Sequence, residues 1–304
     1  MARLLNANFA RLFKGKLFWL CAATSVALGL IEVIPKAIDL MKIGIQPTIC
    51  MYLIHPANRM SYFGILAITA IFVGIFVGTE HSGVLRNKIT AGHRRVSVYM
   101  ADFLTCLSGV VIFQLLFIAT VLLTGIIMGG EFLLPFETIA VYELLQFISL
   151  LGVCALFTAI TMLIPQKLAG AIAALVLTVG FYFINICVDD ALKPLKQEVI
   201  VTDEGTGKTK VIDRMNYTDE ELSQLVVLTF LKNINPFGQD SIIRKNYENT
   251  FIYYEILSDP ELSSTETGYW KNPPVPTELI PYSLVTIIFT TSVGAIVFRE
   301  KNLK

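Results

Sequence analysis

The sequence is short of charged side chains. Only 16% of its 304 residues are Asp, Glu, Lys or Arg, against about 25% in an average soluble domain. So few charges do not cover a water-facing surface. The 24 basic and 24 acidic residues balance, which gives no reason to expect nucleic acid as a partner. The composition therefore argues against both an ordinary soluble protein and a nucleic-acid-binding protein.

Cysteine and histidine are also scarce. The five cysteines are Cys21, Cys50, Cys106, Cys154 and Cys187. None is close to another, and an odd number spread mostly through apolar stretches argues against both zinc sites and disulfides. The three histidines, His55, His81 and His93, lie far apart along the chain. We therefore expect free thiols and no metal site.

Long apolar runs are what the sequence has in abundance. Hydrophobic residues make up 54% of the chain, and the mean hydropathy is +0.64. A helix of about 20 apolar residues crosses a bilayer with its backbone satisfied internally. Six stretches qualify: 17–35, 61–79, 103–128, 142–164, 168–188 and 280–298. The predicted fold class is an all-α polytopic membrane protein with six transmembrane helices.

The basic residues predict which side each loop faces. Twelve Lys and Arg residues lie in residues 1–16, 80–102, position 167 and the tail 299–304, whereas the opposite short loops hold three. Basic loops stay in the cytoplasm, so we expect both termini there, in a plasma membrane. The absence of eukaryotic targeting signals fits a bacterial one.

The first segment, 1–16, has the pattern of a cytoplasmic interfacial helix. Leu5, Phe9, Leu12 and Phe13 fall on one helical stripe, and the basic residues fall elsewhere. Such a helix lies in the headgroup plane. Many membrane proteins use this kind of anchor, so the pattern says little about function.

Residues 205–209, Gly-Thr-Gly-Lys-Thr, resemble part of a phosphate-binding loop. That loop requires G-x-x-x-x-G-K-[ST] between a strand and a helix. Aligning Gly207, Lys208 and Thr209 puts Thr202 where the first glycine should be. The β-branched runs on either side are typical of a hairpin with glycines in its turn. We therefore predict that the chain does not hydrolyse ATP itself.

The rest of the segment between spans five and six also looks folded. Thr218 and Glu221 form a capping box before the apolar run that ends at Leu231, and a second helix is expected over 242–257. Together with the hairpin, these elements predict a small extracellular α+β domain over 189–279. A domain of this size is marginal alone and would lean on the membrane.

Residues 79–99, TEHSGVLRNKITAGHRRVSVY, follow the second span and mix acid and base at high density. Val84, Leu85 and Ile89 fall near helical spacing, with the Arg86–Lys88 stretch on another face. This predicts a short amphipathic helix over 80–95. Residue types alone leave two alternatives open: an anchor for anionic lipid headgroups, or a docking helix for a cytoplasmic partner.

Residues 78–99 resemble the region after the second span of type-2 ABC exporter permeases. The family pattern contains an acidic residue, a Ser-x-Gly, an Arg-Asn-Lys and a Gly-x-x-Arg. The matching residues here are Glu80, the contracted pair Ser82-Gly83, Arg86-Asn87-Lys88, and Gly92 with Arg95. Residues 235–239, NPFGQ, resemble an external turn of Gram-positive members. The basic entry helix, the six spans (five within 17–188) and the insertion before the last span fit the same layout.

The resemblance implies a division of labour. Two permease chains, identical or related, would pair above two separate ATPase subunits that hold ATP and Mg. This chain would carry no cofactor and no enzyme activity. The residues implied in ATPase coupling are Glu80, His81, Ser82, Arg86, Asn87, Lys88, Arg94 and Arg95. Replacing Glu80 and Arg86 together should then uncouple ATP hydrolysis from export. The substrate would be bulky or amphipathic, such as an antimicrobial peptide or a lipid-like compound.

Two other functions stay open. A secondary transporter usually has internal repeats and buried ion-coupling carboxylates, and Glu32 is the best candidate carboxylate in a span. A membrane sensor or scaffold would use the external segment to bind a ligand. A membrane-embedded enzyme is less well supported, because no paired catalytic motif lies in the spans.

Overall fold

The computed structural model describes residues 1–44, 59–81, 83–164, 166, 168–195, 198–202, 209–213, 217–258 and 275–300. Within these ranges, six helices are long and apolar enough to cross a membrane. They are α2 (Lys16–Lys42), α4 (Arg59–Gly78), α6 (Arg95–Ile127), α7 (Phe136–Leu163), α8 (Ala169–Leu192) and α12 (Leu279–Glu300). The predicted helical class is confirmed, and each of the six predicted spans coincides with one of these candidate helices.

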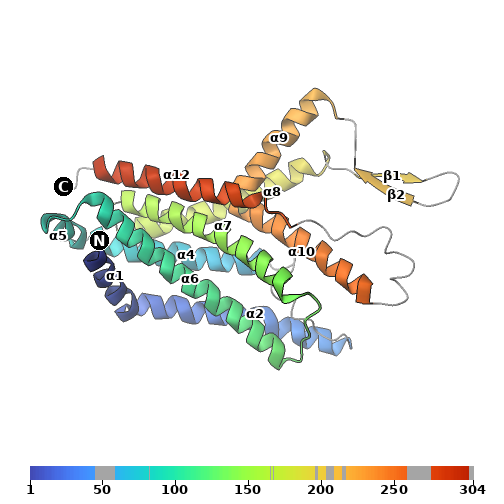
Figure 1. The fold of residues 1–304 in the computed structure, drawn as a ribbon, viewed down its shortest axis with the longest axis horizontal. Helices are drawn as coiled ribbons and strands as arrows, with labels where there is room; N and C mark the ends of the chain where they lie inside the picture. Colours follow the sequence, from blue (N-terminus) through green and yellow to red (C-terminus); the bar gives the residue numbers. More distant parts are fainter. Residues whose placement is uncertain are drawn as a thin grey trace.

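These six helices form one elongated bundle (Figure 1). α7 packs against α12, α4 and α6, while α2 packs against α6 and α8 against α4. The N-terminus and the last turn of α12 lie at one end of the bundle, and the helices α9 (Asp219–Ile234) and α10 (Pro236–Ser258) lie toward the other. An even number of crossings accounts for this placement of the termini.

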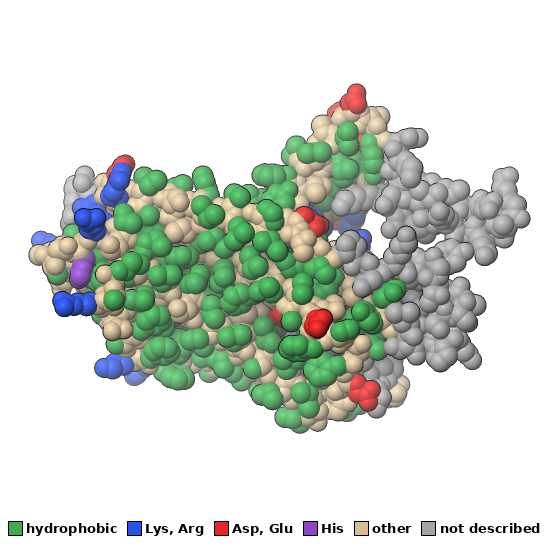
Figure 2. All heavy atoms as spheres, viewed as in Figure 1, with side chains coloured by type: hydrophobic (Ala, Val, Ile, Leu, Met, Phe, Trp, Pro, Cys, Tyr) green, Lys and Arg blue, Asp and Glu red, His purple; other side chains and the backbone are tan. Residues whose placement is uncertain are grey.

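The outer faces of the bundle are apolar. In Figure 2, hydrophobic side chains cover the middle of the visible face, whereas Lys and Arg gather at the end that holds the termini. Trp19, Ile31, Leu123, Ile127 and Phe289 are each more than half exposed. Water-soluble proteins rarely expose apolar patches of this extent. In a bilayer such patches contact apolar lipid tails, so their exposure has little free-energy cost. The surface therefore fits a multi-pass membrane protein.

Two spans exceed the lengths of their predicted apolar stretches by the most. α2 continues through Pro35 to Lys42, although proline usually ends or kinks a helix. α6 begins at Arg95 and has 33 residues, which extend about 50 Å at 1.5 Å per residue. A hydrocarbon core is about 30 Å thick. The first turns of α6 therefore reach beyond the predicted span, and this extension carries part of the site described below.

The N-terminal helix α1 (Ala2–Lys14) packs on the bundle. Its buried residues are Leu4, Asn8 and Leu12, which share one face because they are four residues apart. That face contacts α6 and α2. The predicted apolar stripe shares only Leu12 with it, and Phe13 is 46% exposed. The helix is present, but the structure does not support its prediction as an interfacial helix, because its inner face is taken up by the bundle.

Strands β1 (Glu198–Thr202) and β2 (Thr209–Asp213) pair antiparallel, with Glu198 opposite Asp213 and Thr202 opposite Thr209. The flanks of the phosphate-loop-like run thus lie in a hairpin, as their β-branched residues predict. Residues 203–208, which include most of that run, lie outside the described residues.

The structure does not support a separate external α+β domain over 189–279. α10 packs on α7, and its Phe237, Ile243 and Tyr247 belong to the same buried core as the spans. The rings of Tyr142 and Tyr247 meet edge to face with centroids 5.3 Å apart. The apolar stripe of α10 is therefore buried by the bundle itself, and most of this segment's helical core is shared.

The start of α9 agrees with the sequence. The Thr218 hydroxyl accepts a hydrogen bond from the Glu221 backbone N–H at 3.2 Å, and the Glu221 carboxylate accepts one from the Thr218 N–H at 2.9 Å. The predicted capping box is confirmed. It satisfies two backbone donors that the helix itself leaves open.

The α9–α10 joint, residues 235–239, is buried inside the bundle. The Asn235 side chain accepts from the Phe237 N–H at 3.0 Å and donates to the Phe181 carbonyl of α8 at 2.8 Å. Gln239 donates to the Asn233 carbonyl at 2.7 Å and accepts from the Ser283 hydroxyl of α12 at 2.9 Å. The turn predicted to be external thus ties α9 and α10 to α8 and α12.

Gly238 permits this joint, because a Cβ there would collide with the backbone carbonyl of Lys232. We expect Gly238→Val to destabilise the protein by about 1–3 kcal/mol or more, the usual cost of overpacking. Cys21, Cys106 and Cys154 are buried free thiols, so a dye that fluoresces on reacting with thiols reports unfolding during heating. Gly180→Val on α8 is the matched control, because its Cβ meets no atom within 4 Å. Equal unfolding temperatures for both variants would contradict the prediction.

Candidate functional site

The segment implied in ATPase coupling contains a 3₁₀ turn and one short α-helix before α6 begins. α4 passes into the 3₁₀ turn η2 (Thr79–His81), and α5 (Val84–Thr90) follows. Gly83 has φ +110° and Gly92 has φ +86°, a conformation that side chains disfavour. These glycines interrupt the helical conformation before and after α5. The prediction of one helix over 80–95 is therefore wrong, and Arg95 already belongs to α6.

A buried ion cluster lies beneath α5. Its charged members are Glu80 and Asp102, both fully buried, with Lys88 and Arg11. The Lys88 ammonium lies 2.7 Å from both carboxylate oxygens of Glu80 and 3.1 Å from Oδ1 of Asp102. α5 is thus held by its own lysine to η2, which directly follows α4, and to the start of α6. Leu85 is buried beside it.

The helix α1 completes the ion cluster. Nη2 of Arg11 is 2.5 Å from Oε1 of Glu80, and the Arg11 guanidinium lies 4.0 Å from the centroid of the Phe76 ring. Asn8 donates to Asp102 Oδ1 at 2.5 Å and accepts from Lys88 at 3.0 Å. Four segments, α1, the end of α4, α5 and α6, therefore meet at one point.

By side-chain type, the ion cluster contains two carboxyl groups, one ammonium and one guanidinium. Burying charges costs several kcal/mol per ion unless partners and hydrogen bonds compensate. Lys88 donates hydrogen bonds to three different side chains. These bonds offset the cost of burying its charge only while α5 keeps one orientation. Such a cluster is weak evidence of stability, and its best-supported role is to fix geometry. Here it fixes how α5 is presented.

Three other residues of the predicted coupling set are exposed. Arg86 and Asn87 on α5 are exposed, as is Arg94 just before α6. Arg95 donates to the Arg299 carbonyl at 3.0 Å and so contacts the last turn of α12. The described members of the predicted set therefore include a buried pair, Glu80 and Lys88, that positions α5, and two exposed basic residues, Arg86 and Arg94.

Two members of the predicted set are only partly visible. His81 ends η2, but its side chain is outside the described residues, and so is Ser82. Among the described residues, no group of three or more His, Cys, Asp or Glu side chains is placed to hold a metal ion.

Sequence reasoning missed the partners from outside the 80–95 segment. Asn8 interrupts an otherwise apolar helical face, between Leu4 and Leu12, and Asp102 sits at the head of a long apolar run. Each is a polar residue where an apolar one is expected. That signal marks a buried polar contact but does not identify the partner.

A second buried group of polar side chains lies between α7 and α10. Asp240 accepts from Gln146 at 2.8 Å and from Arg244 at 2.7 Å. All three are buried. Glu143 on α7 has a buried oxygen, Oε2, with no hydrogen-bond partner among the described residues. This group contains two carboxylates and one guanidinium.

Comparisons of the chain with known protein families, with curated proteins and with solved structures find no match.

Proposed function

We propose that this chain is the membrane permease subunit of an ATP-driven ABC exporter of the type-2 class. Separate ATPase subunits would bind the end of the bundle that carries α5 and would hydrolyse ATP with Mg. The chain itself would need no cofactor and would not act as an enzyme. The resemblance of residues 78–99 supports the family, and the geometry around α5 supports the mechanism.

The observation that carries the proposal is the combination of a fixed interior and a basic exterior at α5. The ion cluster joins α5 to α1, α4 and α6, while Arg86 and Arg94 stay exposed. A push on α5 from an ATPase would reach two spans through short, charged contacts. Packed elements pass on such displacements as rigid bodies.

The distribution of basic side chains supports a proposal for which end of the bundle faces the cytoplasm. The end with the termini carries the basic side chains visible in Figure 2, and basic segments stay in the cytoplasm. α1 would then lie at the inner headgroup level, and α9, the hairpin and the end of α10 would lie outside a bacterial plasma membrane. A second permease chain, identical or related, would pair with this one in the bilayer.

The substrate is proposed to be a bulky or amphipathic molecule, such as an antimicrobial peptide or a lipid-like compound. The direction is outward, and nucleic acid is not an expected partner. The support is the family resemblance together with the helices at the outer end of the bundle.

The proposal is tested by gentle purification of the tagged full chain from its own membrane. We expect an ATP-hydrolysing subunit to co-purify in about equal amount, and the preparation to hydrolyse ATP. A preparation without any nucleotide-binding protein, under conditions that preserve other membrane complexes, would contradict the proposal.

A secondary transporter is the second candidate, and the group around Asp240 and Arg244 favours it. Ionisable side chains within spans mark ion pathways in such proteins. Asp240 and Arg244 lie on α10, outside the six spans, but Asp240 bonds Gln146 of the span α7. Glu143 of α7 adds a carboxylate without a hydrogen-bond partner among the described residues. Transport that collapses with the proton gradient while ATP is intact would support this candidate. The sensor or scaffold alternative predicts ligand binding without transport in either condition.

A further inference from the structure

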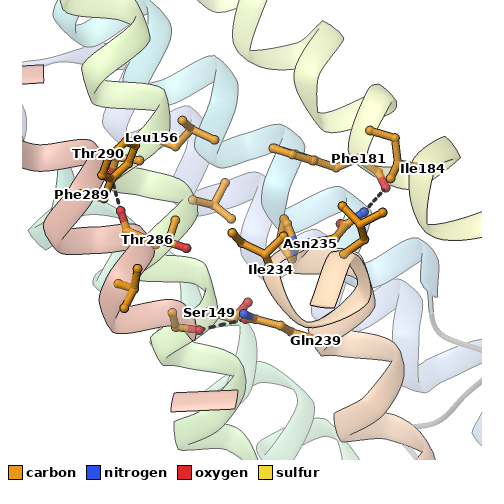
Figure 3. Close-up of a pocket in the computed structure, with 16 residues that line it drawn as sticks. Ser149, Leu156, Phe181, Ile184, Ile234, Asn235, Gln239, Thr286, Phe289 and Thr290 are labelled. Atoms are coloured by element: carbon orange, nitrogen blue, oxygen red, sulfur yellow. Dashed lines mark hydrogen bonds between the residues drawn. The ribbon is translucent and has the colours of Figure 1, made fainter. Parts of the chain in front are cut away.

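A cavity of about 360 Å³ lies toward the outer end of the bundle, between α7, α8, α12 and the α9–α10 joint (Figure 3). Its volume is within the roughly 300–1,000 Å³ range of ligand pockets. Ser149 and Gly152 of α7 and Gln239 of the joint are among the buried residues that line it.

The mouth of the cavity is apolar and exposed. Ile184 on α8, Ile234 on α9, and Val285 and Phe289 on α12 all line it, and their exposed fractions are 48%, 41%, 60% and 65%. The cavity therefore opens on the side of the bundle, in the surface shared by two candidate membrane spans. A ligand can therefore enter the cavity from the side of the bundle, without passing along the bundle axis.

The polar groups of the lining are largely satisfied within the protein. Ser283 and Gln239 bond each other, Gln239 also donates to a backbone carbonyl, and Asn235 donates to Phe181. Thr286 and Thr290 each donate to a backbone carbonyl one turn earlier. An occupant is therefore not needed to complete these hydrogen bonds. An apolar chain fits this lining better than a charged or strongly polar molecule.

The surroundings of the mouth indicate which apolar molecule reaches it. α12 and α8 are the two least buried of the six spans, with 11% and 28% of their apolar windows buried. Their exposed faces run continuously into the mouth through Ile184 and Phe289. In a membrane these faces are covered by lipid tails, so the molecule next to the opening is a lipid.

We propose that this cavity binds one acyl chain of a bilayer lipid, which enters sideways between α8 and α12. The chain would pack against the α9–α10 joint and so link the joint to the spans. This inference does not rest on the export function and holds equally for the alternatives above. It names a lipid site on a part of the chain remote from α5.

The test uses the full chain in vesicles of phosphatidylethanolamine and phosphatidylglycerol. A fraction of the phosphatidylglycerol carries a photoactivatable diazirine on one acyl chain, and adducts are located by mass spectrometry of peptides. We expect adducts to concentrate on the cavity-lining residues of α7, α8 and α12 and on the α9–α10 joint. Adducts spread evenly over all the lipid-facing helices would show ordinary solvation only and would overturn the proposal.

Ile184→Trp narrows the mouth, and Val176→Trp, two turns away on α8 and 64% exposed, is its matched control. We expect cavity adducts to fall about tenfold in Ile184→Trp and to be unchanged in Val176→Trp. Tenfold corresponds to about 1.4 kcal/mol, close to the transfer free energy of two methylene groups. Equal adduct yields in the two variants would overturn the proposal.

Gly152→Leu fills the cavity from α7 and provides an independent variant. A Cβ at Gly152 meets the nearest atoms of Ser283 and Thr286 at 3.7 Å, which is ordinary contact, so the rest of the leucine enters the cavity. We expect the same loss of adducts, with thiol-dye unfolding showing that the protein is folded. Cross-links between two copies of the chain at this face, in place of lipid adducts, would show that a second copy covers it and would overturn the proposal.

Discussion

Glu80→Gln is expected to destabilise the protein by about 3 kcal/mol. The fully buried carboxylate faces Lys88 and Arg11, and its loss leaves two cations with one remaining carboxylate. Breaking a buried pair by removing one partner costs about 3–5 kcal/mol, and the lower end applies because Arg11 is 30% exposed. The measurement is the thiol-dye unfolding profile of the purified protein in detergent.

Glu137→Gln is the control for this variant, because Glu137 is an exposed glutamate in the first turn of α7. Its removal should change stability by less than about 0.5 kcal/mol. Adding Lys88→Met to Glu80→Gln should recover part of the loss, because the double variant removes the unpaired ammonium. If Glu80→Gln unfolds at the temperature of Glu137→Gln, the ion cluster does not hold α5.

Reversing the exposed charges on and next to α5 is expected to leave stability unchanged and to weaken binding of the ATPase. Arg86→Glu combined with Arg94→Glu should leave the unfolding temperature within the range of surface substitutions, because both side chains are exposed. On the proposed function, it should lower the amount of co-purified ATPase more than tenfold, because like charges facing a partner cost several kcal/mol. The measurement is the ratio of the two subunits after purification.

The control for the charge reversal is Arg3→Glu combined with Lys14→Glu. These residues are exposed on α1 at the same end of the bundle, and the change in net charge is the same. Partner binding should survive in the control. Retention of the ATPase by the Arg86 and Arg94 variant would show that α5 is not the docking surface.

These two experiments replace the double substitution of Glu80 and Arg86 that the sequence suggests. Glu80 is buried in the ion cluster and Arg86 is exposed, so the double variant would mix a folding defect with a docking defect. In separate variants, the unfolding temperature tests the buried ion cluster, and co-purification of the ATPase tests the exposed docking surface.

Local sequence determined much of this protein. The six spans follow from the lengths of the apolar runs, because each helix satisfies its backbone within its own segment. The capping box at Thr218 and the pairing of β1 with β2 follow from contacts between residues close in the chain. The sequence identifies Glu80 and Lys88 as candidates for ATPase coupling, but it does not show that their side chains point into the protein.

Only the tertiary structure decided where the polar side chains and the apolar stripes are buried. Lys88 follows the exposed polar residues Arg86 and Asn87. Its inward direction depends on the carboxylate of Glu80 in η2, on that of Asp102 in α6 and on Asn8 of α1. From the sequence alone, the apolar stripe of α10 could be buried either in a small separate domain or against the spans. In the structure it packs on α7 and belongs to the core of the bundle. Contacts between distant segments set both outcomes, and no local pattern encodes which surface a side chain will meet.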